Sequence, residues 1–196
     1  MILNVPLIKQ KPNSHACGII CSYMVLKYKK YNINLKTISR NIKIREGIIG
    51  PQLVKGLLKL NINVELIVYA PQIFYSSSIK DLEKVYRKTK IKHLRSSIKQ
   101  MLDIKEAIKI EPINSSLLIR LIRKKIAPIV LISSPVFRKR FYGRQQLHYV
   151  VVCGYDRSYF FVNDPHPKFG GRLKIKKEDL ISSIYFQPFP QVIVIK

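Results

Sequence analysis

The sequence contains few acidic residues, few cysteines and no tryptophan. Only 11 aspartates and glutamates accompany 36 lysines and arginines, so the formal net charge is +25. The three cysteines are odd in number, and none belongs to a CxxC pair or to a His/Cys cluster with zinc-ligand spacing. These absences argue against disulfide-stapled and zinc-stabilised domains, favour a reducing compartment, and give no reason to expect a metal or another cofactor.

Long apolar runs are also missing. No stretch reaches the length of a membrane-spanning helix, and the first ten residues lack the charged start and apolar run of a signal peptide. We therefore expect a soluble, cytoplasmic protein without a transmembrane segment. With 196 residues, 47% of them apolar, the chain is long enough for one domain with a substantial core.

The positive charge has two explanations. A protein that binds nucleic acid or a membrane surface carries such a charge as its electrostatic footprint. The alternative is a compositional bias that favours lysine, isoleucine, asparagine and tyrosine throughout. Because the lysines are spread along the whole chain, we favour the bias and do not expect nucleic acid as a partner. An acidic substrate or partner stays compatible with this charge.

The apolar pattern predicts early helices followed by a run of antiparallel strands. An apolar helix is predicted from Cys17 to about Lys30, with Ile20, Met24 and Tyr28 on one stripe. Further helices are predicted at residues 35–42, 51–60, 79–110 (with a break near 95–97), 114–125 and 177–183. Strands are predicted at residues 61–69, 128–132, 147–155, 158–163, 172–175 and 191–195, and a basic loop at 133–146. This order predicts an α+β fold in which N-terminal helices pack on a C-terminal antiparallel sheet.

Cys17 is the candidate nucleophile of this chain. It lies at a helix start, where outward-pointing N–H groups and the positive end of the dipole favour the thiolate over the thiol. Acyl transfer by a thiolate also needs an imidazole, a group that orients the imidazole, and donors for the oxyanion. His148, at the head of a predicted strand, is the candidate imidazole. The backbone N–H of Cys17 and the side-chain amide of Gln10 are the candidate oxyanion donors.

Either Asn163 or Asp164 can orient the imidazole, because both lie at the same end of the predicted hairpin as His148. Successive residues of a strand point to opposite faces, so the turn decides between them. A two-residue turn puts Asn163 on the face of His148, whereas a three- or five-residue loop puts Asp164 there. We favour Asp164, with Asn163 as the second choice.

Four short motifs follow one another along the chain: Val5-Pro6-Leu7-Ile8-Lys9-Gln10, Ala16-Cys17-Gly18, His148-Tyr149-Val150-Val151-Val152-Cys153-Gly154-Tyr155 and Val162-Asn163-Asp164-Pro165. In this order they resemble the C39-like peptidases of the papain-like cysteine protease superfamily. The resemblance implies a papain-like fold in a single domain over residues 1–196, with a divergent helical insert at about 71–125. It also implies catalytic roles for four residues: the nucleophile Cys17, the base His148, the orienting Asp164 and the oxyanion-hole Gln10.

The expected function is that of a cysteine peptidase, which cleaves a peptide or protein substrate, such as a leader or N-terminal segment, through a Cys17 thioester. Two alternatives stay open: an acyltransferase or transpeptidase on the same scaffold, and a non-catalytic peptide-binding domain. In the non-catalytic case Cys17 would be an ordinary buried helix cysteine and His148 an ordinary strand-end histidine. The candidate substrate-binding residues are His15, Asn163, Arg138, Arg140 and Arg144. The sequence leaves the oligomeric state unspecified.

Overall fold

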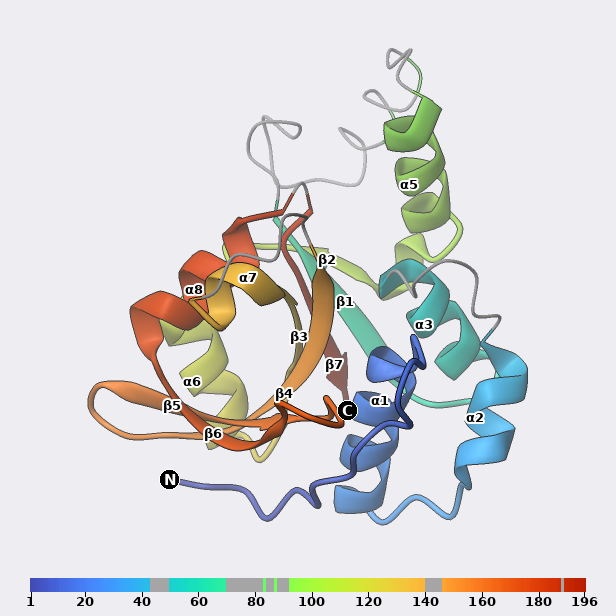
Figure 1. Cartoon of the computed structure of the whole chain (residues 1–196). Helices are drawn as coiled ribbons and strands as arrows, with labels where there is room; N and C mark the ends of the chain where they lie inside the picture. The colour runs from blue at the N-terminus through green and yellow to red at the C-terminus, as the bar shows by residue number, and fades with distance from the viewer. Residues whose placement is uncertain (43–49, 70–82, 84–86, 88–91, 140–145, 188) are drawn as a thin grey trace.

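The computed structural model describes residues 1–42, 50–69, 83, 87, 92–139, 146–187 and 189–196. Its centre is a curved seven-stranded sheet with helices on both faces (Figure 1). The helices are α1 (Cys17–Tyr28), α2 (Leu35–Asn41), α3 (Gly50–Leu58), α5 (Lys92–Leu102), α6 (Ser115–Arg123), α7 (Ser134–Phe137) and α8 (Lys177–Tyr185), with a 3₁₀ turn η1 (Lys105–Ala107). The predicted α+β class is confirmed.

The strands lie in the order β2-β1-β7-β3-β4-β5-β6. Their bounds are β1 (Val64–Val68), β2 (Ile108–Ile110), β3 (Ile129–Ser133), β4 (Leu147–Tyr155), β5 (Tyr159–Asp164), β6 (Gly171–Lys176) and β7 (Gln191–Ile195). All neighbours pair antiparallel except β1 and β2, which are parallel. β3, β4 and β7 are almost continuously buried, as expected for central strands covered on both faces.

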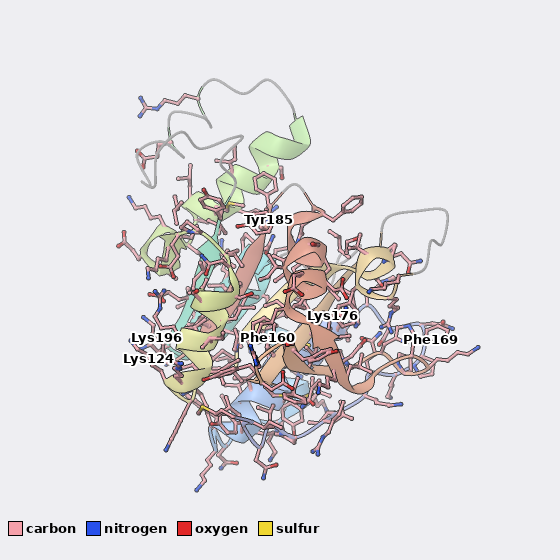
Figure 2. The ribbon with its side chains drawn as sticks, turned by 90° about the vertical axis from the view of Figure 1, so that its left-hand side faces the viewer. Lys124, Phe160, Phe169, Lys176, Tyr185 and Lys196 are labelled. Carbon is pink, nitrogen blue, oxygen red and sulfur yellow. The ribbon has the colours of Figure 1, made fainter. Side chains whose placement is uncertain are left out.

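The core fills the space between this sheet and the helices on its two faces. α1 and α3 pack on one face, and α6 and α8 on the other (Figure 1). Phe160 lies inside the molecule, whereas Lys124 and Lys196 lie at its surface (Figure 2). α1 is buried along most of its length, which explains why it is apolar nearly all round and not amphipathic.

The N-terminal segment lies along the β4–β5 hairpin. Ile2 forms an isolated bridge with Gly154, and the backbone N–H of Leu3 donates to the carbonyl of Cys153 at 2.7 Å. Gly154 has to be a glycine here, because a Cβ atom would lie 2.7 Å from the Met1 carbonyl oxygen. The first residues of the chain are therefore fixed beside β4, which carries His148, and β5, which carries Asp164.

Three local predictions differ from the structure. Residues 108–110 form β2 instead of the end of a helix, because Ile108 and Ile110 pair with β1 and this tertiary contact overrides helix propensity. α5 runs without a break through residues 95–97. Within the predicted loop 133–146, residues 134–137 form α7, which has a proline in its first turn. The boundaries of the expected insert at about 71–125 stay a prediction.

Candidate active site

Cys17 is the first residue of α1, and its side chain is half-buried. Its N-cap neighbour Ala16 makes no side-chain hydrogen bond to the first turn, so the N–H groups there are not used by a cap, and Cys17 lies at the positive end of the helix dipole. Burial raises the pKa of Cys17, but the hydrogen bond and charge of His148, with backbone hydrogen bonds at Tyr149 and Gly18, lower it more strongly. The net effect is a pKa below the ordinary thiol value.

His148 is the second residue of β4 and is buried. Its Nε2 atom lies 2.7 Å from Oδ1 of Asp164, which leaves Nδ1 for the hydrogen bond with Cys17. Burial alone would lower the pKa of His148, but its hydrogen bonds to Asp164 and Cys17, together with their charges, raise it to about 9. Between these two shifted pKa values the pair exists as a thiolate and an imidazolium, which is the reactive state of a cysteine nucleophile.

Asp164 is the last residue of β5 and is completely buried. Oδ1 accepts hydrogen bonds from Nε2 of His148 and from the backbone N–H of His166 at 2.8 Å, and Oδ2 accepts one from Arg138 at 2.5 Å. Burial raises the pKa of Asp164, but the hydrogen bond and charge of His148, the charge of Arg138 and the N–H of His166 lower it below its ordinary value. The carboxylate is thus ionised and fixed behind the imidazole.

A β-bulge at Cys153 sets the register of the two strands that carry this pair. On the turn side of the bulge Gly154 pairs with Phe161, and on the site side Val151 pairs with Asn163. The two paired residues on β5, Phe161 and Asn163, are therefore two positions apart, whereas those on β4, Val151 and Gly154, are three positions apart. Cys153 is the extra residue, and it shifts all pairing beyond it by one position.

This shift decides which side chain faces His148. Without the bulge, the uninterrupted register would bring Asn163 to the face of His148, because side chains alternate along a strand. With the bulge, Asp164 shares that face, and the Asn163 side chain donates to the carbonyl of Val5 at 3.0 Å. The turn length considered in the sequence analysis is therefore not sufficient to choose between the two residues.

Gln10 lies on the loop before α1 and is hydrogen-bonded both to the segment after Asp164 and to its own loop. Its backbone N–H donates to the carbonyl of Pro165 at 2.8 Å, directly after Asp164, and its side-chain Nε2 donates to the carbonyl of Ser14 at 2.9 Å. One Nε2 hydrogen is used in this way, and the second is left for a ligand. Among the residues that the structure describes, no hydrogen bond joins the Gln10 side chain to Cys17 or His148.

The candidate substrate-binding residues lie in different environments. His15 is exposed on the loop two positions before Cys17, where a substrate can reach it. Arg140 and Arg144 lie outside the described residues. Arg138, expected on a solvated loop, instead directs its guanidinium inward onto Asp164, with only 11% of its side chain exposed. The expected contact between Arg138 and a substrate stays a prediction.

Two neighbours of the site were not expected from the sequence. Arg138 was expected near a substrate, and its contact with Asp164 was not predicted because its inward position depends on α7. His166 is the other, and its ring centroid lies 6.0 Å from that of His148 in an edge-to-face arrangement. The spacing of two residues between Asp164 and His166 was the available signal, since a residue that follows a site carboxylate so closely stays near it.

The fold of this chain is that of C39 peptidase domains, which are papain-like. Three solved structures show it: a putative C39-like peptidase from Bacillus anthracis (15% identity, TM-score 0.57, covering 100% of this chain and 96% of that one), the peptidase domain of Streptococcus ComA, a bifunctional ABC transporter (15%, 0.53, 98% and 98%), and a double-glycine-motif protease from an AMS/PCAT transporter in complex with the leader peptide (17%, 0.51, 100% and 94%).

The sequence model of the "Peptidase_C39 like family" matches residues 2–187, so the chain belongs to the C39-like peptidase family. The resemblance inferred from the four motifs is confirmed. No curated protein matches the chain. At the identities of these three structures the likeness establishes the fold, whereas activity has to be argued from the site itself.

Two further properties of the described residues concern metals and membranes. Within the described part of the chain, no group of three or more His, Cys, Asp or Glu side chains is arranged to hold a metal ion. Among the helices whose residues are described, none is both long and apolar enough to cross a bilayer. The expected cytoplasmic location stays a prediction.

Proposed function

We propose that this protein is a cysteine peptidase in which Cys17 attacks the substrate and His148 transfers the proton. The supporting observation is the arrangement of three residues: Cys17 at the N-terminus of a buried helix, His148, whose hydrogen bond and charge lower the pKa of Cys17, and Asp164, with Oδ1 2.7 Å from Nε2 of His148. An ordinary core cysteine and an ordinary strand-end histidine do not require a buried carboxylate behind the imidazole. The arrangement matches the requirements of acyl transfer by a thiolate.

In the first half of the proposed reaction, Sγ of Cys17 attacks the carbonyl carbon of the scissile peptide bond and forms a C–S bond. The N–H of Cys17 and the free Nε2 hydrogen of Gln10 stabilise the oxyanion. His148 then gives its Nδ1 proton to the leaving nitrogen, the C–N bond breaks, and a thioester remains. Asp164 keeps the imidazole in the orientation that this proton transfer needs.

In the second half, neutral His148 takes a proton from water, whose oxygen attacks the thioester carbonyl. The C–S bond breaks, the carboxylic acid product leaves, and the thiolate–imidazolium pair is restored. An acyltransferase would use an amine in place of this water. Product analysis with added amine separates the two outcomes, because only acyl transfer yields the new amide.

We propose a peptide or protein segment as substrate, with a leader segment as the first choice. The support is the similar fold of the double-glycine-motif protease whose structure contains a leader peptide. The high positive charge of this chain also favours acidic residues in the substrate. A synthetic leader-like peptide with a double-glycine site and acidic residues before it is therefore the suitable probe.

The test compares cleavage of this peptide by the unmodified protein, by Cys17→Ala and by Cys153→Ala. Cys153 is buried on β4 and takes no part in the proposed chain of hydrogen bonds, so it is the matched control. We expect C17A to lose turnover and C153A to retain it. Turnover by C17A at the unmodified rate would contradict the proposal, and binding without turnover by every form would favour the non-catalytic alternative.

A further inference from the structure

The guanidinium of Arg138 lies directly behind the proposed catalytic residues. Arg138 follows α7, and three of its atoms are engaged at once: Nη2 with Oδ2 of Asp164 at 2.5 Å, Nη1 with the carbonyl of Phe169 at 3.0 Å, and Nε with Oγ of Ser134 at 3.2 Å. Its planar group also lies over the rings of Phe137 and Phe169. All three nitrogen positions of the fork have a partner, and these partners lie on α7, at the end of β5 and in the loop after β5.

The two carboxylate oxygens of Asp164 have different partners. Oδ1 faces His148 and the backbone of His166, whereas Oδ2 faces Arg138. Donors on both oxygens fix the plane of a carboxylate more firmly than donors on one. Because Asp164 is completely buried, an Oδ2 atom that lost Arg138 would have no water to replace it, and the carboxylate would turn or take up a proton.

We propose that Arg138 is a positioning residue of the active site, which holds the Asp164 carboxylate ionised and in plane so that His148 stays aligned with Cys17. This inference rests on the proposed peptidase function. It gives Arg138 a role in the reaction without contact to substrate. Lysine cannot reproduce the role fully, since it has one nitrogen in place of a planar fork.

The loop after β5 is held by the same residue. Phe169, whose carbonyl binds Arg138, lies at the edge of the molecule (Figure 2) and stacks on His166 with ring centroids 5.1 Å apart. Nδ1 of His166 accepts the backbone N–H groups of Lys168 and Phe169. Arg138 thus braces the loop that supplies a second donor to Asp164, so its removal is expected to loosen both sides of the carboxylate.

The experiment measures the pH profile of Cys17 alkylation by iodoacetamide, together with kcat and KM for the leader-like peptide, in Arg138→Met and Arg138→Lys. Without the guanidinium, Asp164 takes up a proton at a higher pH. The thiolate–imidazolium pair then forms only above the pH at which Asp164 is ionised. We expect the acid limb of alkylation in R138M to move up by about one pH unit. We also expect kcat to fall about 30-fold with little change in KM. R138K restores the charge but loses about fivefold in kcat.

The matched control is Arg120→Met. Arg120 is exposed on α6, and it pairs with Glu111, the residue after β2, at 3.1 Å. R120M should leave the pH profile and kcat unchanged. An R138M protein that is folded by circular dichroism and has the unmodified profile and kcat would overturn the inference. If R138M does not fold, an unmodified kcat in R138K has the same consequence. Failure of the peptidase proposal is distinguishable, because Cys17 of the unmodified protein would then show no preferential alkylation.

Discussion

Replacing Asp164 with asparagine tests how far the thiolate–imidazolium pair depends on the buried carboxylate. D164N keeps the size of the side chain and one oxygen acceptor. It removes the negative charge that lies between His148 Nε2, at 2.7 Å, and Arg138 Nη2, at 2.5 Å. Arg138 then remains as a nearly buried positive charge without its carboxylate, which disfavours a second positive charge on the imidazole. We therefore expect His148 to hold its proton less tightly.

The magnitude follows from the shifted titration of His148. Its surroundings raise its pKa from 6.5 to about 9, and Asp164 and Cys17 share in this increase. The loss of Asp164 should lower the pKa of His148 by at least about one unit, which corresponds to a tenfold change in the ratio of imidazolium to imidazole. Because activity requires the imidazolium, the alkaline limb of kcat/KM should move down from near pH 9 by the same amount.

The pH dependence of the stability of the fold should show the same shift in the pKa of His148. A pKa raised on folding stabilises the protein fully below the unfolded value of 6.5, and this contribution is lost as the pH rises through about 9. D164N should reduce that pH dependence of the melting temperature between these two values. The size of this reduction measures how much of the increase in the pKa of His148 is caused by Asp164.

The assay is the pH profile of kcat/KM for the leader-like peptide, with D156N as control. Asp156 is an exposed carboxylate at the turn of the same hairpin, where it pairs with Lys174 at 3.1 Å. Asparagine there can still accept the N–H groups of the turn, so D156N should retain the alkaline limb near pH 9. An unchanged alkaline limb in D164N would refute the argument that Asp164 supports the charged imidazole.

Two further predictions concern the oxyanion and the helix start. Gln10→Ala should reduce kcat about 100-fold without changing the pH profile of Cys17 alkylation, because it removes an oxyanion donor and leaves the ion pair intact; unchanged kcat would leave Gln10 a loop-bracing role only. Gly18→Val should destabilise the fold by about 1–3 kcal/mol in urea unfolding. A Cβ atom added at Gly18 would lie 3.1 Å from the side chains of Leu53 and Tyr149. Unaltered stability would show that these two side chains can move away without cost.

The arrangement of secondary structure was largely predictable, because the period of the apolar residues changes along the chain. β4 and β7 have the predicted bounds, and α1 begins at the predicted Cys17. These segments are long and strongly patterned. β2 was not predictable, because it has only three residues within a helix-prone stretch, and its pairing with β1 comes from tertiary contact.

The candidate site was predictable in its residue types but not in its register. Nothing in the local sequence announces a bulge at Cys153, although the bulge decides that Asp164 and not Asn163 faces His148. Arg138 was interpreted as a substrate-binding residue on a basic loop. Its inward position depends on α7 and on a buried carboxylate 26 residues away, a relation that only the folded chain reveals.

The central claim is that the environment of Cys17, unlike that of the other two cysteines, favours the thiolate. Burial raises the pKa of Cys21 well above its ordinary value and that of Cys153 to about 11, whereas His148 lowers that of Cys17. Treating the native protein with limiting iodoacetamide at about pH 6 and mapping the label by mass spectrometry compares all three in one molecule. We expect the label on Cys17 alone. Equal labelling of the three, or an unlabelled Cys17, would contradict the account.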